Sequence, residues 1–184
     1  MILIICNMGK VVRIDTIHHG DRLKCSANGS GVRITAWFLG CDLMCPHCHN
    51  QEYWDFDNPQ FPDFSDEHVQ LIISEMSTYP NIYSGLSILG GEPFAKPNID
   101  DVLKLASMFR LKFPDKTIWI WSGHTYDWLK SQDGEYGEKI RKIFETCDVL
   151  VDGPFIQSKR NISLRFRGSE NQHIIDLKTG EVVE

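Results

Sequence analysis

The sequence predicts an α/β fold with a mostly parallel sheet. Short runs of β-branched and aromatic residues alternate with amphipathic helical segments along the chain, and such alternation is typical of βαβ units. A complete eight-stranded β/α barrel needs about 250 residues, so the 184 residues of this chain allow only an incomplete, TIM-type barrel. No repeat, linker or low-complexity tract divides the chain. We therefore expect a single domain over residues 1–184, with residues 1–27 as an extension of uncertain structure.

The first predicted elements are a strand, a cysteine-rich loop and a helix. The β-branched and aromatic run over residues 32–39 predicts a strand that ends at Gly40. Residues 56–64 contain two prolines and are expected to be irregular. Ser65 offers an N-cap, followed by two acidic residues in the first turn, for a helix that runs to about Ser77.

Further strand and helix patterns alternate through the second half of the chain. Residues 86–89 predict a short apolar strand closed by two glycines. Asn98 is expected to cap a helix whose apolar residues recur with the helical period through Phe109. The remaining expected elements are a buried strand over 116–121, a helix over 138–147, a strand over 148–151 and an extended segment over 164–177.

Composition and charge favour a globular protein in a reducing compartment. Hydrophobic residues make up 42% of the chain and charged residues 24%, which is ordinary for a packed domain. The net charge of −6 argues against a nucleic-acid partner, because such a domain needs a basic stripe. The apolar start over residues 1–6 is too short for a signal peptide or a membrane span. We therefore expect a cytoplasmic protein, in which clustered cysteines more often hold metals than form disulfides.

Three of the six cysteines stand close together directly after the first predicted strand. Cys41, Cys45 and Cys48 have a C-x3-C-x2-C spacing. Thiolates are natural ligands of iron–sulfur clusters, and three ligands leave the last iron of a cubane open to bind a substrate. On spacing alone a zinc site stays open, in which His47 or His49 completes the tetrahedron. A redox thiol pair is less favoured, because the motif lacks a helix-start context.

Other candidate motifs stand at the ends of the predicted strands. They are Gly-Gly-Glu at residues 90–92, Ser-Gly-His at 122–124 and Asp-Gly at 152–153. Functional loops of a parallel sheet gather at the carboxyl ends of its strands, so these segments are expected to meet the cysteine loop at one edge. Glycine at such a position leaves room for a ligand to approach the backbone.

The cysteine loop, followed one βα unit later by Gly-Gly-Glu-Pro at residues 90–93, resembles the radical S-adenosylmethionine (SAM) superfamily. The resemblance implies a partial β/α barrel of the radical SAM type. It also implies a 4Fe–4S cluster on Cys41, Cys45 and Cys48, whose open iron is chelated by the amino and carboxylate groups of SAM. By the same resemblance, the SAM contacts are His47, Cys48, His49 and Gly91, with Gly90 and Glu92 supporting that strand end.

Two later blocks narrow the resemblance. Val-Leu-Val-Asp-Gly-Pro-Phe-Ile at 149–156 and Leu-Arg-Phe-Arg-Gly-Ser-Glu-Asn-Gln at 164–172 resemble the activating proteins of anaerobic (class III) ribonucleoside-triphosphate reductases. The resemblance spans residues 28–176. It implies an enzyme that forms a glycyl radical on the reductase and receives its electron from a flavodoxin-type donor. A homodimer, or a heterotetramer with the reductase, is the implied assembly.

Several alternatives stay open at this point. An activator of another glycyl-radical enzyme or a deazapurine-type radical SAM enzyme would share the minimal size, and a non-catalytic zinc-binding module would share the cysteines. The family usually has Tyr where this chain has His49. Asp152 is suited either to the ribose of SAM or to capping a turn, and Arg167 to the carboxylate of SAM or to the partner. His18 and His19 have no assigned role.

Overall fold

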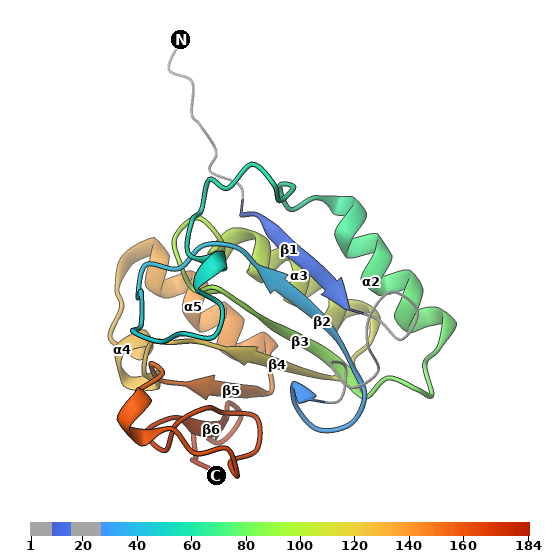
Figure 1. Cartoon of the computed structure of the whole chain (residues 1–184). Coiled ribbons are helices and arrows are strands. Elements are labelled where there is room, and N and C mark those ends of the chain that lie inside the picture. The colour runs from blue at the N-terminus through green and yellow to red at the C-terminus, as the bar shows by residue number, and fades with distance from the viewer. Residues whose placement is uncertain (1–8, 16–26) are drawn as a thin grey trace.

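The computed structural model describes residues 9–15 and 27–184, and within these residues six strands form one sheet in the order β1-β2-β3-β4-β5-β6 (Figure 1). The strands are β1 (Val11–Asp15), β2 (Arg33–Phe38), β3 (Gly85–Gly90), β4 (Thr117–Trp121), β5 (Val149–Asp152) and β6 (His173–Asp176). Strands β2 to β5 run parallel, and β1 and β6 pair antiparallel at the two edges. The predicted α/β class with a mostly parallel sheet is confirmed. The sheet is mixed and open, since its two edge strands do not pair with each other.

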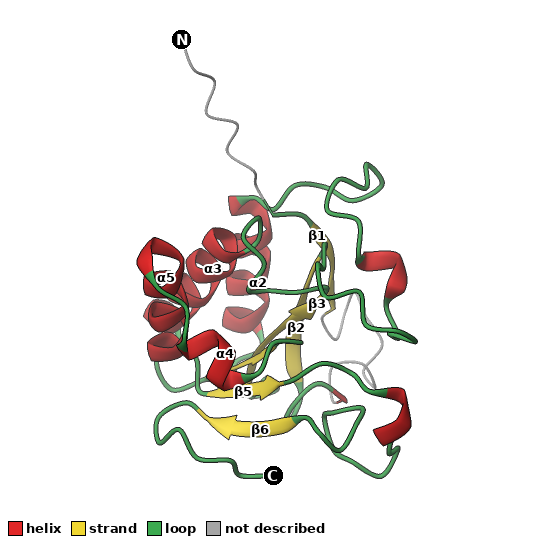
Figure 2. Cartoon of the chain, turned by 90° about the vertical axis from the view of Figure 1, so that its left-hand side faces the viewer, coloured by secondary structure: helices red, strands yellow, loops and turns green. Residues whose placement is uncertain are grey.

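The longer helices all lie on one face of the sheet (Figure 2). The helices are α2 (Asp66–Thr78), α3 (Ile99–Lys112), α4 (Tyr126–Lys130) and α5 (Gly134–Thr146), and the short 3-10 turns are η1 (Gln51–Tyr53) and η2 (Gln157–Lys159). The loops that follow β2 and β5 lie on the opposite face, where the view in Figure 2 shows no long helix over the described strands. This division leaves one face of the sheet to the core and the other to the site.

The core lies between the sheet and the helices because side chains alternate along each strand. Ile34, Ala36 and Phe38 of β2 belong to the main apolar cluster, together with residues of α2, α3 and α5. Thr35 and Trp37, the residues between them, do not. The same alternation in the neighbouring strands places Leu89, Trp119 and Trp121 in clusters outside the main core. The second face of the sheet is therefore aromatic and partly polar.

The predicted elements agree with the structure in kind and differ at some ends. The helix expected over 138–147 begins four residues earlier, at Gly134. The extended tail is strand only over β6, and its antiparallel pairing was not predicted. The sequence pattern also missed β1 and the short helix α4. The predictions made for residues 1–6 and for His18 and His19 lie outside the described residues.

The predicted cap at Asn98 is wrong in its chemistry. Asn98 does precede α3, but its side chain makes no capping hydrogen bond. Its Nδ2 instead donates to the backbone carbonyls of Leu39 at 2.9 Å and Glu92 at 3.0 Å. The amide is fully buried between the ends of β2 and β3, where it satisfies carbonyls that water does not reach. Asn98 therefore stands at the N-cap position of α3, while its side chain joins strand ends instead of capping the helix.

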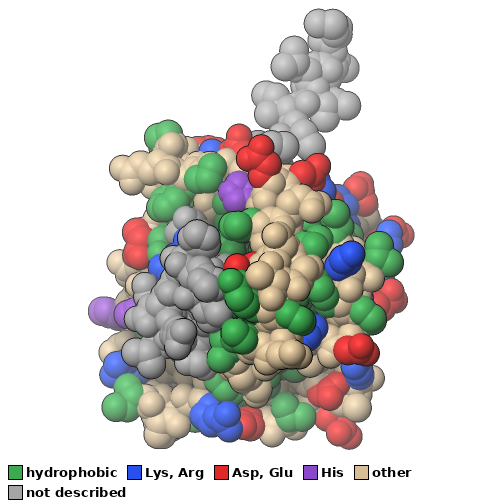
Figure 3. Space-filling model, turned by 90° about the vertical axis from the view of Figure 1, so that its right-hand side faces the viewer, with side chains coloured by type: hydrophobic (Ala, Val, Ile, Leu, Met, Phe, Trp, Pro, Cys, Tyr) green, Lys and Arg blue, Asp and Glu red, His purple; other side chains and the backbone are tan. Residues whose placement is uncertain are grey.

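The outer surface shows no single dominant feature in the view of Figure 3. On that face, Lys and Arg side chains of the described residues are scattered among Asp and Glu rather than gathered in one stripe. None of the helices in the described parts of the chain is long and apolar enough to cross a bilayer.

Candidate metal centre

The cysteine loop is closed at its base by two backbone hydrogen bonds. Gly40 N donates to Tyr53 O at 2.7 Å, and Cys41 N donates to Trp54 O at 3.1 Å. Gly40 has φ +93°, and a Cβ there would lie 1.9 Å from the ring of Phe56. Only glycine therefore lets the chain leave β2 and turn directly into the loop.

Two residues of the loop adopt strained backbone conformations. Met44 has φ +43° and His47 has φ +61°, the left-handed region that residues with a side chain rarely occupy. Such a conformation costs on the order of 1 kcal/mol or more per residue and is concentrated at functional sites. Cys48 N donates to Cys45 O at 3.0 Å, which closes a tight turn between these two cysteines. The loop thus keeps two strained backbone conformations together with the turn that holds Cys45 and Cys48 close to each other.

One cavity of about 250 Å³ joins the cysteines to the predicted strand ends. Its lining includes Cys41, Cys45, Cys48, Gly90, Gly91, Glu92, Ser122, Gly123 and Gly153. These residues come from the loop after β2 and from the ends of β3, β4 and β5. The structure thus brings the cysteines and the Gly-Gly-Glu segment together at the carboxyl edge of the sheet.

The two glycines of that segment are required by the neighbouring strand. A Cβ at Gly91 would lie 2.2 Å from Gly40 O, and one at Gly90 would lie 2.1 Å from Phe38 O. From the sequence, these glycines are predicted to leave room for a ligand beside the backbone. In the structure, the space that a side chain would fill holds the backbone at the end of β2. Close packing of β3 against the cysteine loop explains both residues.

Glu92 is fully buried and ties several strand ends together. Its Oε1 accepts hydrogen bonds from Phe94 N at 2.9 Å and Ser122 Oγ at 3.0 Å. Its Oε2 accepts from Gly123 N at 2.8 Å. Burial raises the pKa of Glu92 to about 7, although these hydrogen bonds oppose the shift. The side chain therefore acts on the backbone around the cavity and holds the ends of β3 and β4 together.

Burial favours the protonated form of two of the loop thiols. Burial raises the pKa of Cys41 to about 12 and also raises that of Cys45. A thiol binds metal as the thiolate, so metal binding here would release protons. Asn50 N donates to Cys48 Sγ at 3.4 Å, a contact that stabilises negative charge on that sulfur.

The three loop cysteines lie at the same cavity. Among the described residues, no three His, Cys, Asp or Glu side chains lie close enough together to hold one metal ion. A 4Fe–4S cluster has a different requirement, because each thiolate binds its own iron. Three thiols on one strained loop, all lining one cavity, meet that requirement.

The two loop histidines lie apart from the Gly-Gly-Glu segment. His47 and His49 line a second cavity of about 430 Å³, whereas Gly90, Gly91 and Glu92 line the first. Cys48 lines both. The structure therefore brings the six residues predicted to contact or support SAM to two adjoining cavities rather than one.

The structure gives other candidate residues structural partners. The carboxylate of Asp152 accepts from Tyr126 N at 2.7 Å and lies 2.9 Å from His173 Nδ1. Asp152 thus accepts the first backbone N–H of α4, whose N-cap residue is Thr125. His124 stacks on Trp128, with ring centroids 3.8 Å apart. Neither Asp152 nor His124 lines the first cavity.

Some lining residues were missed by the sequence argument. Asn28, Trp37, Phe155 and Gln172 all line the first cavity. Alternation along the predicted strand 32–39 could have placed Trp37 on the face away from the core. Phe155 and Gln172 belong to the two late sequence blocks, which were recognised without a role for these residues.

Trp37 is held by residues that sequence reasoning did not connect with the site. Its Nε1 donates to Asp15 Oδ2 at 3.0 Å, and the guanidinium of Arg13 lies 4.2 Å from its ring centroid. Both partners stand on β1. The extra strand at the edge of the sheet thus fixes one wall of the first cavity.

Comparison with known proteins gives a consistent picture. A family described as a 4Fe-4S single cluster domain matches residues 27–175. The anaerobic ribonucleoside-triphosphate reductase-activating protein of Escherichia coli K12 is 33% identical over 151 residues, which cover 82% of this chain and 92% of that protein. The protein of the same name from Haemophilus influenzae is 35% identical over 147 residues, covering 80% and 89%. That of Enterobacteria phage T4 is 29% identical over 147 residues, covering 80% and 85%.

Proposed function

Because the chain belongs to the family of anaerobic ribonucleoside-triphosphate reductase-activating proteins, we propose that it forms the glycyl radical of such a reductase with a SAM-cleaving 4Fe–4S cluster. The observation that carries the proposal is a single cavity lined both by three thiols and by the Gly-Gly-Glu strand end. A cavity with only thiols would suit a structural metal. The adjoining strand end adds backbone acceptors for a substrate beside the metal.

The cysteines hold the cluster in this proposal. Cys41, Cys45 and Cys48 would each hold one iron and would leave the fourth iron to the amino and carboxylate groups of SAM. A cluster held there would supply the one electron needed for reductive cleavage of SAM to methionine and a 5′-deoxyadenosyl radical, which would take a hydrogen atom from a glycine of the reductase. No general base is needed for hydrogen-atom abstraction, and we assign none.

The residues around the cluster position SAM. The backbone of Gly90 and Gly91 lines the cavity and offers carbonyl acceptors to the amino group of SAM. Glu92 keeps this backbone in place through its hydrogen bonds to the end of β4. His47 and His49 contact the adenine side from the second cavity, across the wall that Cys48 shares.

The proposal also covers the type of fold, the electron donor and the assembly of the activator. The open sheet corresponds to a partial β/α barrel of the radical SAM type, in a single domain. The electron comes from a flavodoxin-type protein in the cytoplasm. The activator works as a homodimer, or in a heterotetramer with the reductase, and needs neither nucleic acid nor membrane.

Anaerobic reconstitution with iron and sulfide tests the proposal. We expect about four irons and four sulfides per chain, with broad visible absorption. Reductant and SAM should then yield 5′-deoxyadenosine, and addition of the purified anaerobic reductase should yield a glycyl doublet in the EPR spectrum. One colourless zinc per chain, with neither product, would instead identify a zinc-binding module.

Two cysteine variants sharpen this test. Cys48→Ser should lose the cluster and both products. Cys147→Ala is the matched control, because Cys147 is buried in the main core, far in sequence from the loop. It should keep its iron. Full iron content and SAM cleavage in the Cys48→Ser protein would contradict the assignment of the ligands.

A further inference from the structure

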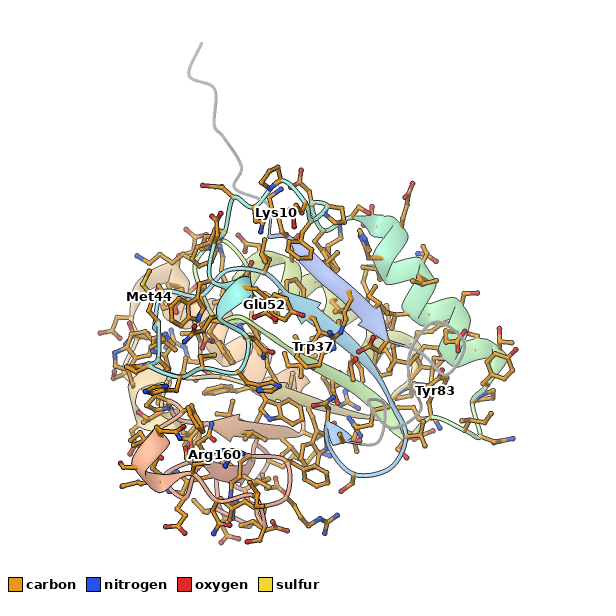
Figure 4. The ribbon with its side chains drawn as sticks, in the orientation of Figure 1. Lys10, Trp37, Met44, Glu52, Tyr83 and Arg160 are labelled. Atoms are coloured by element: carbon orange, nitrogen blue, oxygen red, sulfur yellow. The ribbon has the colours of Figure 1, made fainter. Side chains whose placement is uncertain are left out.

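The second cavity differs from the first in its charge. It lies against the cysteine loop and the segment after β5, and it is lined by Arg160 and Arg167 together with His47 and His49. Figure 4 shows Arg160 in that segment, on the same side of the molecule as Met44 of the cysteine loop. Proposed SAM binding uses the histidine side of this cavity and leaves its arginines without a role.

The basic residues are concentrated in an otherwise acidic chain. Residues 155–169 contain four Lys or Arg and no Asp or Glu, whereas the whole chain carries a net charge of −6. Like charges placed this close repel one another, so they favour a site for an anion. The positive charge of residues 155–169 is complementary to the negative charge of an acidic partner.

Within this segment, the guanidinium of Arg167 has nitrogens without a hydrogen-bond partner in the described part of the chain. Its Nε and Nη1 are buried and have no hydrogen-bond partner among the described residues. A guanidinium is always charged, and a buried charge without a partner is costly. A carboxylate is the group that satisfies several guanidinium N–H donors at once.

The backbone around Arg167 is fixed without help from its side chain. Phe166, the residue before it, has φ +61°, and its carbonyl accepts from Trp121 Nε1 at 2.9 Å. Gly168 N, on the other side, donates to Gln172 Oε1 at 2.8 Å. The backbone that carries the Arg167 side chain is therefore held in one conformation by its neighbours.

The two cavities adjoin, so an anion in the second cavity can be part of the same molecule that reaches the first. Both are lined by Cys48, Asn50, Phe155 and Gln172. A peptide that delivers a glycine to the first cavity can lie along this shared wall and leave a neighbouring side chain in the second. Ile162 and Leu164 also line the second cavity, and Ile162 is 83% exposed. An exposed apolar rim suits a peptide better than a free phosphate.

We propose that Arg167 and Arg160 bind a carboxylate of an acidic peptide segment of the reductase, the segment that carries the glycine to the first cavity. This inference rests on the proposed function. It assigns the second cavity to recognition of the partner.

The test compares arginine variants of the whole activator, reconstituted with its cluster, against the purified anaerobic reductase. Arg167→Met should raise the reductase concentration needed for half-maximal radical formation by about tenfold or more. Arg160→Met should raise it as well. Arg160 is exposed, so this second variant tests the cavity even if the first is poorly folded. Arg165→Met is the matched control, because it removes the same charge from the same segment and Arg165 does not line the cavity.

Three outcomes would overturn the inference. An unchanged half-maximal reductase concentration in both cavity variants would show that the arginines do not bind the partner. A rise of about tenfold in the SAM concentration needed by Arg167→Met would assign the guanidinium to SAM instead. Binding of inorganic phosphate to the isolated wild-type activator, lost in Arg167→Met, would assign it to free phosphate. Failure of the wild-type protein to form any radical would instead count against the proposed function itself.

Discussion

Arg33 and Arg167 stand at different parts of the molecule and differ in how the N–H donors of their guanidinium groups are satisfied. Arg33, at the amino-terminal end of β2, is fully buried. All its N–H donors are used, by Ser87 Oγ, Ser30 O, Thr117 Oγ1, Leu86 O and Thr117 O, at 2.7 to 3.2 Å. Arg167, beside the carboxyl-end cavities, has two buried nitrogens without a partner among the described residues.

The difference separates the part of the sheet that holds the fold from the part that holds the chemistry. Burial lowers the pKa of Arg33 to about 9, which still leaves it charged at neutral pH. Its neighbours are neutral acceptors that join β2, β3 and β4. At the carboxyl edge of the sheet, the Arg167 nitrogens that have no partner among the described residues are available to a ligand.

Replacement of Arg33 should have the largest effect. Arg33→Met leaves the buried Ser87 hydroxyl and several strand carbonyls without donors, so we expect the free energy of unfolding to fall by about 3–5 kcal/mol. Urea unfolding of the reconstituted protein, followed by tryptophan fluorescence, measures this. Arg33→Lys keeps the charge and fewer donors, and should lose an intermediate amount. A loss below about 1 kcal/mol for Arg33→Met would show that the network does not hold the strands.

Asp148 should give the next largest effect, at the same edge as Arg33. Its Oδ2 accepts from Ile118 N at 2.8 Å and pairs with Arg110, and its Oδ1 pairs with Lys178 at 3.0 Å. Burial would raise the pKa of Asp148, but these donors outweigh it and lower the pKa. Stability from this carboxylate is therefore present above its ordinary pKa and is lost as the pH falls. Asp148→Asn should cost about 3 kcal/mol at neutral pH and less in acid, measured by urea unfolding. An equal loss at both pH values would contradict the ionic role.

These residues show what the sequence could predict. Strand and helix periods are local, so the order of elements and the edge that carries Cys41 and Glu92 followed from the pattern. Four of the five hydrogen bonds of the Arg33 guanidinium reach residues 53 to 84 positions away along the chain. No local pattern connects them. The same holds for Asn98, whose residue type suits a cap and whose tertiary partners are carbonyls of other strand ends.

The site divides in the same way. The spacing of Cys41, Cys45 and Cys48 is local, and the structure places all three at one cavity. His47 has φ +61° and lines the second cavity with residues that follow β5, whereas Gly91 lines the first. A residue other than glycine gives no signal of a left-handed backbone in the sequence. The sequence therefore predicted the cluster loop better than the surroundings of its histidines.

Glu92 should show the opposite pH dependence to Asp148. Burial raises the pKa of Glu92 to about 7, above its ordinary value near 4.5. A carboxyl with a raised pKa contributes stability that is present at low pH and lost as the pH rises through the folded-state pKa. We expect the wild-type protein to lose about 2 kcal/mol between roughly pH 5 and pH 8 from this group. Glu92→Gln should flatten that slope in urea unfolding, at the cost of the hydrogen bond from Gly123 N.

A control separates Glu92 from the rest of the protein. Asp100, an exposed carboxylate on α3 that pairs with Lys139, serves as the matched site. Asp100→Asn should leave the loss between these pH values in place. If Glu92→Gln keeps the same slope as the wild-type protein, its carboxyl does not carry a proton in the folded state near neutral pH.

Replacement of Arg167 should have the smallest effect on the free energy of unfolding. This result decides whether Arg167, unlike Arg33, is dispensable for the fold. Arg167 is half-buried, and its Nε and Nη1 have no hydrogen-bond partner among the described residues, so Arg167→Met breaks no hydrogen bond at these two atoms and keeps most of the side-chain volume. We expect the free energy of unfolding to change by less than about 1 kcal/mol. Urea unfolding beside Arg33→Met measures both sites on one scale. A loss as large as that of Arg33→Met would mean that the Arg167 guanidinium holds the segment after β5 in place, and loss of reductase binding in that variant would then reflect a displaced loop.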